Sequence, residues 1–428
     1  MGYEKTAMAL GAYPGGYIKL ASQLDIDFTV GTGVNITGER LGRLLYEFLD
    51  VPYVRALQSE NALKYEAEGK TLAQTFDIFT VSGLVSANDK TSIFADTPLS
   101  DGEVMIDKSV YYDRCGAGEY IGGDVFAWCK GEEADAAVFY VSRSDRRFKE
   151  ITLSADEIDG AEYLSDYIRV SYTRGARSHT LKLSLTAREF YNLGYSGASD
   201  IAEHINSVAK NKNGTVRLAD NFGSGIYDAA YIEEYETYVV KSAAPSENRI
   251  NLKDSGRDFI ELDENKTDYI ELKRNGADCE ISKLAENDII TYYASENGKI
   301  IRIYAIAAVP GSKDYNNKIE GRLISIKTED GYATIELDGL VYDTTVDFWQ
   351  RNKDKLSIGL NYTVYLNSEN QIAWMSGTDS GEAYGFLLGI NSNDDTDSAL
   401  RIRLLGADNS IVIYECADRL TVYDGEKK

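Results

Sequence analysis

The sequence predicts a mainly β protein. We expect a short N-terminal helical module, then a string of small β-barrel-like domains of the OB or SH3 kind and one larger mixed β domain. From about Phe76 onward, apolar residues alternate with polar ones or form short runs between turn residues, which is typical of strands. The chain has 31 Tyr and 13 Phe, and such rings suit sheets with one solvated face. A chain of 428 residues exceeds one core, so roughly three to five domains are expected.

The first 54 residues have a helical pattern instead. Apolar residues recur at helical spacing in two stripes, one between residues 15 and 30 and one between residues 41 and 49. Thr37 stands where an N-cap residue belongs, and Pro52 is expected to stop the second helix. The stripes consist of Ile18, Leu20, Ala21 and Leu24, and of Leu41, Leu44, Leu45, Phe48 and Leu49.

The residue order of this segment resembles an S-layer homology (SLH) repeat. The resemblance rests on Gly2-Tyr3-Glu4, on Ala12-Tyr13-Pro14-Gly15-Gly16-Tyr17-Ile18, and on residues 36–41 and 44–52. It implies a cell-surface or S-layer protein of the Firmicutes type, located outside the cell at the cell wall. Two helices joined by a glycine-rich loop are what one SLH repeat contains.

The repeat departs from its family where wall polysaccharide is bound. Thr37 aligns with the first residue of the family's Thr-Arg-Ala-Glu stretch, but Gly38, Glu39 and Arg40 follow it. An arginine makes two parallel charged hydrogen bonds to a carboxylate, and glycine cannot replace it. We therefore interpret the repeat as degenerate, with polysaccharide bound mainly through SLH repeats missing from this chain. No basic and apolar leader follows Met1, so we expect a fragment whose export signal lies upstream.

An internal repeat suggests the domain boundaries. Units begin with glycine and an apolar strand at Gly83, Gly321 and Gly385, and hairpins such as 361–365 with 371–374 follow. Units of this size indicate small closed sheets. The prediction is an SLH-like module at 1–54, a connector at 55–81, a barrel unit at 82–147, a small β unit at 248–308, a barrel unit at 317–377 and an incomplete barrel unit at 383–428.

Residues 148–241 fit this repeat less well and are predicted as the larger mixed β domain. Strands are expected at 150–153, 167–172 and 181–185, and a helix near 199–210. A strand pair is expected after the helix, at 214–218 and 229–240.

The charge balance limits the partners. The chain has 69 acidic and 45 basic residues, a formal net charge of −24, and no basic stripe. Such a field repels phosphate backbones, so we expect no nucleic-acid partner. No run of 18 or more apolar residues exists, so no membrane span is expected.

One loop has the composition of a calcium site. In residues 220–228, Asp220, Ser224 and Asp228 take the first, fifth and ninth places of a calcium-loop pattern, around Gly225. Phe222 has no side-chain oxygen at the third place, and Ser224 replaces an acid, so ligand charge is low. The other interpretation, which we favour, is a turn between two strands. No cofactor is certain, and calcium is the candidate.

The remaining residues argue against catalysis. The chain has only His179 and His204, both expected at surface or edge positions, and no Cys-x-x-Cys pair. Cys115 and Cys129 are expected as buried thiols, with a disulfide between them as the alternative. The three tryptophans, expected to fill barrel cores, are Trp128, Trp349 and Trp374.

The sequence therefore favours a non-enzymatic structural component of the bacterial cell surface, a stalk or tile whose partners are neighbouring copies in a lattice or filament. One alternative is a carbohydrate-active enzyme with a carboxylate pair in domain 148–241. A deep acidic cleft there, with Trp or Tyr on its floor, would favour that alternative. A third hypothesis is a calcium-stiffened adhesin.

Overall fold

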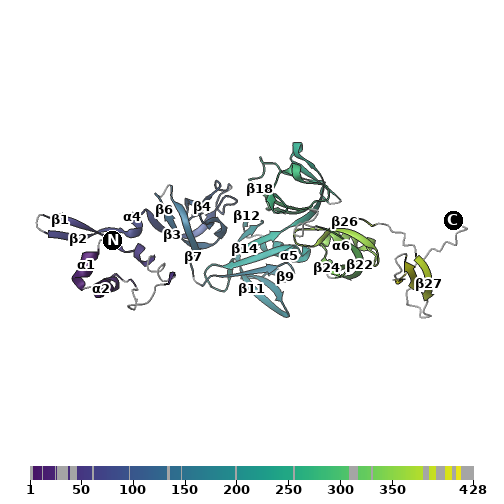
Figure 1. Cartoon of the computed structure of the whole chain (residues 1–428), viewed down its shortest axis with the longest axis horizontal. Coiled ribbons are helices and arrows are strands. Elements are labelled where there is room, and N and C mark those ends of the chain that lie inside the picture. The colour runs from purple at the N-terminus through teal and green to yellow at the C-terminus, as the bar shows by residue number, and fades with distance from the viewer. Residues whose placement is uncertain are drawn as a thin grey trace.

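The protein is mainly β, as predicted, and consists of several small barrel or half-barrel sheets with few short helices. Most of the sheets follow one another along the long axis of the molecule, and the sheet that contains β18 (Tyr269–Arg274) lies to one side of this row (Figure 1). The computed structural model describes residues 3–11, 13–24, 26, 37–38, 46–59, 62–95, 97–132, 135–145, 147–197, 200–253, 256–307, 317–328, 331–378, 385–391, 401–406 and 411–415.

The N-terminal helices are short. Helix α1 (Glu4–Leu10) crosses helix α2 (Gly15–Gln23) so closely that a Cβ on Gly16 would lie 2.1 Å from the Ala7 carbonyl oxygen. Most of the second predicted helix lies outside the described residues, and residues 46–49 are helical. The small core of this module contains Ala21, Ile26 and Val51.

The predicted connector at 55–81 contains regular structure. Strands β1 (Pro52–Ser59) and β2 (Ala62–Thr71) form an antiparallel hairpin that is a sheet by itself. The one-turn helix α4 (Leu72–Thr75) follows. Thr71 caps it, because its Oγ1 accepts a hydrogen bond from Gln74 N while Gln74 Oε1 accepts one from Thr71 N.

The first barrel has the connectivity of an OB fold rather than of an SH3 fold. Its five strands close in the order β3-β4-β5-β7-β6, with β5 and β7 parallel. The helical turn η1 (Ala117–Tyr120) lies between the third and fourth strands. The strands are β3 (Ile78–Ala87), β4 (Glu103–Ile106), β5 (Ser109–Asp113), β6 (Asp124–Lys130) and β7 (Ala137–Arg143).

The third barrel repeats this connectivity. Its order is β24-β23-β22-β25-β26, and a parallel bridge between Thr344 and Ile372 links the third strand to the fifth. Helix α6 (Val346–Asn352) takes the place of η1. The strands are β22 (Lys318–Thr328), β23 (Ala333–Leu337), β24 (Leu340–Asp343), β25 (Asn361–Leu366) and β26 (Ile372–Thr378).

The second barrel unit is a seven-stranded sheet that stays open, with the same strand order and an interrupted third strand. β17 pairs with β16, whereas β18 pairs in parallel with β21, so β17 and β18 together take the place of one strand. β15 belongs to this unit, although residues 236–241 were predicted in the larger domain. The elements are β15 (Glu236–Ala244), β16 (Arg249–Lys253), β17 (Phe259–Glu261), β18 (Tyr269–Arg274), β19 (Ala277–Asp278), η3 (Ile281–Lys283), β20 (Ile289–Ala294) and β21 (Ile300–Ile306).

The C-terminal unit is a three-stranded antiparallel sheet in the order β27-β28-β29. It corresponds to the first three strands of a barrel. The incomplete barrel predicted for 383–428 stays a prediction, because much of that range lies outside the described residues. The strands are β27 (Gly385–Asn391), β28 (Arg401–Gly406) and β29 (Ile411–Glu415).

All four small units share a bulge in the first strand. A bulge bends a strand, so that in the complete barrels its first half pairs with strand four and its second half with strand two. The register between the first and second strands shifts at Val85/Ala87, Val240/Ser242, Leu323/Ser325 and Leu387/Gly389.

The larger domain is a mixed sheet in the order β8-β13-β14-β11-β10-β9, with β12 beside β11 and helix α5 (Ile201–Asn211) on one face. β11 and β14 are parallel. The strands are β8 (Lys149–Ser154), β9 (Ile158–Tyr163), β10 (Ile168–Arg174), β11 (Arg177–Tyr191), β12 (Gly194–Gly197), β13 (Gly214–Asp220) and β14 (Tyr227–Glu234).

Shared cores join neighbouring units. Phe190 and Tyr231 of the larger sheet belong to the same buried cluster as Val125 of the first barrel. Val239 of the second barrel packs with Tyr365 of the third. These contacts hold the first barrel on the larger sheet and the second barrel on the third.

The tryptophans were expected in barrel cores, and two of them lie between units. Trp128 makes an edge-to-face contact with Tyr46 of the N-terminal module, at 5.6 Å between ring centroids. Trp374 packs at the interface of the second and third barrels. Trp349, which is on helix α6 and not on a strand, packs against the core of the third barrel.

Candidate functional site

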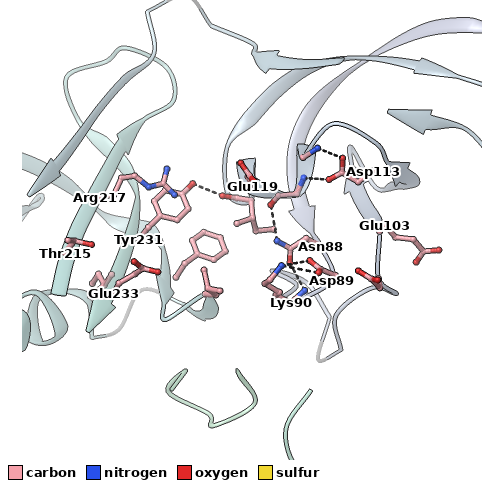
Figure 2. Close-up of a pocket in the computed structure, with 18 of the residues that line it drawn as sticks. Asn88, Asp89, Lys90, Glu103, Asp113, Glu119, Thr215, Arg217, Tyr231 and Glu233 are labelled. Carbon is pink, nitrogen blue, oxygen red and sulfur yellow. Dashed lines mark hydrogen bonds and ion pairs between the residues drawn. The ribbon is translucent and has the colours of Figure 1, made fainter. Parts of the chain in front are cut away.

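A cleft of about 630 Å³ separates the first barrel from the larger sheet. The barrel contributes the loop 88–102 between β3 and β4 and the turn η1, and the sheet contributes β11, β13 and β14. Figure 2 shows these two walls facing each other. In OB folds the loop between strands one and two commonly contributes to ligand binding, so this cleft is the candidate site.

Hydrogen bonds fix the barrel wall. Asn88 Nδ2 donates to the Gly118 carbonyl oxygen at 3.0 Å, and Asn88 Oδ1 accepts from the Thr91 N–H at 2.8 Å. Asp113, at the end of β5, accepts hydrogen bonds from four successive backbone N–H groups, those of residues 115–118. The loop and the turn η1 are therefore held rigidly against each other.

Tyr231 dominates the sheet wall. Its hydroxyl donates to the Ile121 carbonyl oxygen of the barrel at 2.6 Å. Phe190 stacks on the Tyr231 ring with centroids 5.2 Å apart, and the Arg217 guanidinium lies 3.8 Å from the ring centroid. The ring is thus engaged by protein groups and is a poor platform for a sugar. Burial raises the pKa of the Tyr231 hydroxyl, so it stays protonated.

The cleft is acidic. Six carboxylates line it against two cations, Lys90 and Arg217. This field repels anions and favours a neutral polar or cationic group. The carboxylates are Asp89, Asp101, Glu103, Asp113, Glu119 and Glu233.

Most of these carboxylates already bind protein groups. Glu233 pairs with Arg302 of the second barrel at 2.9 Å, and Asp89 pairs with Lys90 at 3.1 Å. Glu103 accepts a hydrogen bond from the Ser100 N–H at 3.1 Å. Lys90 also lies 5.2 Å from the ring centroid of Tyr269. The cleft is therefore a junction of three units with partly satisfied polar walls.

The calcium candidate lies in the turn between β13 and β14, outside this cleft. Asp220 is buried, and its Oδ2 accepts from the Gly225 N–H at 2.8 Å. Its Oδ1 accepts from the Ser224 N–H at 3.0 Å and from the Ser224 hydroxyl at 3.3 Å. This bonding is that of a turn held by an aspartate.

Asp228 points to other partners. Its Oδ1 accepts from the Asn221 N–H at 2.8 Å, and its Oδ2 pairs with Arg188 at 3.3 Å. Arg188, which lies on the parallel strand β11, was not predicted from the sequence as a partner of Asp228. Asp220 and Ser224 are therefore in direct contact, while the Asp228 carboxylate is paired with Arg188. Calcium binding stays a prediction.

A polar network under helix α5 was not predicted from the sequence. His204 Nδ1 lies 2.7 Å from Oε1 of the fully buried Glu189. The Tyr191 ring stacks on the imidazole at 4.3 Å, and its hydroxyl donates to Glu234 Oε2 at 3.0 Å. His179 lies exposed on β11, as expected, but His204 is half buried.

Burial alone would lower the pKa of His204. The hydrogen bond that the imidazole donates to Glu189 and the negative charge of Glu189 outweigh that effect, so the pKa of His204 is raised. The pair fixes helix α5 on the sheet, and neither residue lines the cleft described above.

The described cysteines are free thiols. Cys115 is exposed and Cys129 is buried, so the structure places them as unpaired groups, and Cys115 is not buried as expected. Cys416 lies outside the described residues. Burial raises the pKa of Cys129 to about 11, with a further rise from Cys115.

In the part of the chain that the structure describes, no three His, Cys, Asp or Glu side chains are grouped to hold a metal ion. None of the described helices is long and apolar enough to cross a membrane. The chain matches no family model, and no curated protein matches it significantly in sequence.

Proposed function

We propose that this chain is a non-enzymatic structural component of the bacterial cell surface, a spacer or tile of the S-layer or SLH-associated kind. Its place is outside the cell at the wall, with neighbouring copies and, through further SLH repeats, wall polysaccharide as partners. The observation that carries the proposal is the direct packing of units on one another: the first barrel shares a buried core with the larger sheet, and the second barrel shares one with the third (Figure 1). Packing of this kind keeps the units at fixed positions relative to one another, which a spacer needs.

The residue order of the N-terminal module supports a location at the cell surface. Residues 1–54 resemble an SLH repeat, and α1, α2 and the small core around Ala21 form a compact helical end. Tyr3 links this end to the following hairpin, because its hydroxyl donates to the Pro52 carbonyl oxygen at 2.9 Å.

Two measurements test the proposal. Small-angle scattering of the chain should give an elongated particle, and a compact particle would contradict the spacer role. Antibodies against the chain should label intact cells of the bacterium that makes it. Labelling that requires permeabilised cells would contradict the surface location.

A second candidate is a carbohydrate-active site: the cleft is acidic, although its carboxylate from domain 148–241, Glu233, is paired with Arg302 and the Tyr231 ring is engaged by Arg217. Calorimetric titration with cell-wall oligosaccharides tests it, with Glu119→Gln as the variant and Glu247→Gln, remote in the second barrel unit, as the control. Binding lost only in Glu119→Gln would support this candidate. Absence of binding would leave the structural role. The adhesin hypothesis has less support, since Asp220 and Asp228 already bind protein groups.

A further inference from the structure

A second cleft lies where the larger domain, the second barrel unit and the third barrel meet. This junction cleft is formed around Asn211, Tyr238, Asp347 and Gln371, and helix α5 lies beside α6 and β26 in Figure 1. Its volume is about 470 Å³, within the range of about 300–1,000 Å³ that is usual for small-ligand sites. None of its lining residues lines the acidic cleft, so the two clefts are separate.

The charges that line the junction cleft are balanced. Glu236 and Asp347 are its acids, and Arg257 and Arg351 are its cations. Asp347 accepts a hydrogen bond from Arg351 at 2.7 Å, and the Arg257 guanidinium lies 5.2 Å from the ring centroid of Tyr292. In contrast to the acidic cleft, this lining has no net charge that would attract a cation or an anion.

Neutral polar groups make up most of the remaining lining. They are three amide side chains, two threonines and two tyrosines. Val346 is the one aliphatic side chain among the described lining residues, so an apolar ligand or the side chains of a bound peptide would find little apolar surface. The composition favours an uncharged ligand that is held by hydrogen bonds.

The protein fixes the orientation of the Gln371 amide. Asn367 Oδ1 accepts hydrogen bonds from the backbone N–H groups of Glu369 and Gln371, at 3.0 and 2.9 Å, so Asn367 Nδ2 must act as the donor. Gln371 Oε1 accepts from this Nδ2 at 3.0 Å and from the Tyr235 hydroxyl at 3.1 Å. Gln371 Nε2 is therefore left as a donor to the cleft, without a protein acceptor in the described part of the chain.

Two asparagine amides are fixed in the opposite sense. Asn211 Nδ2 donates to Glu234 Oε1 at 2.9 Å and to Ser207 Oγ at 3.2 Å, and Asn213 Nδ2 donates to the Tyr235 carbonyl oxygen. A carboxylate and a carbonyl only accept, so the Oδ1 atoms of both asparagines are left as acceptors. Asn213 Oδ1 is buried and has no hydrogen-bond partner among the described residues, which costs folding free energy until a donor reaches it.

The junction cleft thus presents one amide donor and two acceptors whose orientations are set before a ligand arrives. Each hydroxyl of a sugar ring both donates and accepts, so neighbouring hydroxyls can bind an amide donor and an amide acceptor together. Groups that are already held in place lose little entropy on binding.

We propose that the junction cleft binds an uncharged saccharide through Gln371, Asn211 and Asn213. The larger domain contributes the two asparagines and the third barrel contributes the glutamine, so the bound saccharide joins these units. The site lies outside the SLH-like module and involves no chemical step. It goes beyond the structural role proposed above, because it assigns a ligand to the β domains themselves.

Calorimetric titration of the full chain with trisaccharides tests this site. The uncharged probes are maltotriose, mannotriose and N,N′,N″-triacetylchitotriose. Deacetylated chitotriose is the cationic probe, and trigalacturonic acid is the anionic one. Wild type should bind at least one uncharged trisaccharide with a Kd below about 1 mM and should bind neither charged probe more tightly.

Two variants remove single ligand contacts while keeping the protein contacts around them. Gln371→Glu retains an oxygen for Asn367 and Tyr235 and replaces the amide donor with a second oxygen. Asn211→Ala removes an acceptor from the opposite wall, and Glu234 keeps its other donors. Each should weaken binding about tenfold, the loss expected for one hydrogen bond, with a melting temperature close to that of wild type.

Gln350→Glu is the matched control, because it makes the same chemical change at an exposed position of helix α6 that does not line the cleft. It should bind as wild type does, and so should Glu119→Gln in the acidic cleft.

Three results would overturn the proposal. The first is a wild-type chain that binds none of the uncharged trisaccharides, since the cleft then holds water only. The second is binding that both junction variants retain or that Glu119→Gln abolishes, and the third is tighter binding of a charged probe. Each leaves the shape from scattering and the surface labelling unchanged, so failure of this site differs from failure of the structural role.

Discussion

A Cβ on Gly83 would lie 2.7 Å from the Cβ of Asp107, because the β4–β5 turn folds back over the first strand of the first barrel. The third barrel has the same relationship, where a Cβ on Gly321 would lie 3.1 Å from the Asp338 carboxylate. Asp107 and Asp338 both have positive φ, 47° and 46°. The glycine of the repeat is therefore needed for a close approach between strand one and this turn.

Gly83→Ala should destabilise the first barrel by about 1–3 kcal/mol, since the new methyl group must displace Asp107. Hydrogen exchange of the β3 and β4 amides measures the local free energy of unfolding. Gly256→Ala is the control, because a Cβ there meets no atom within 4 Å, and its effect should stay within about 0.5 kcal/mol. Equal effects of both substitutions would contradict the packing argument.

The strands and hairpins of the small units could be predicted because their signals are local. Alternation and turn residues identified the β25–β26 hairpin. Small closed sheets were predicted, but the choice between the OB and SH3 strand orders could not be made, because the parallel bridge between Thr344 and Ile372 joins residues far apart in the chain. That bridge, with the helix before strand four, is what distinguishes the OB order from the SH3 order.

The boundary near residue 241 could not be predicted for a physical reason. Strands β14 and β15 are separated by Tyr235 alone, so one apolar stretch serves two sheets without a linker. The residues that line the cleft could not be named from the sequence, because its walls come from five or more separate elements. Glu189 and His204 meet through strand–helix packing, and the sequence gives no sign of that pair.

Stability should fall as pH rises through the folded-state pKa of His204. That pKa is raised by the Glu189 hydrogen bond and charge despite burial, with further contributions from Glu296 and Asp200. The folded state therefore binds the proton more tightly than the unfolded state. Its stabilisation is fully present below the unfolded value of about 6.5 and is lost above the folded value.

Denaturant unfolding between about pH 6 and pH 9 measures this dependence. His204→Gln should remove this contribution, while His179→Gln, at an exposed position, should retain it. The interpretation is wrong if His204→Gln leaves the pH profile unchanged.

Asp220→Ala should lower the unfolding free energy by about 2–3 kcal/mol whether or not calcium is present. The buried carboxylate binds the N–H groups of Ser224 and Gly225, which would be left without partners. Thermal melting with added Ca²⁺ and with a chelator measures the effect. Phe222→Ala is the control in the same loop, because Phe222 is 50% exposed. A calcium-dependent rise in melting temperature that Asp220→Ala abolishes would establish the calcium site instead.

Cys129 should be inert in the native protein and Cys115 should react first. Cys129 is buried in the barrel core, and burial with the nearby Cys115 raises its pKa to about 11, so the thiolate is scarce at neutral pH. Burial and Asp113 also raise the pKa of Cys115, which makes its labelling slow but measurable. Peptide mapping after timed alkylation at pH 7.5, with and without denaturant, resolves the two sites. Cys115→Ser should remove the early product alone. A mapped Cys115–Cys129 disulfide would instead require the turn before η1 to approach the barrel core, because the structure places one thiol outside and the other inside.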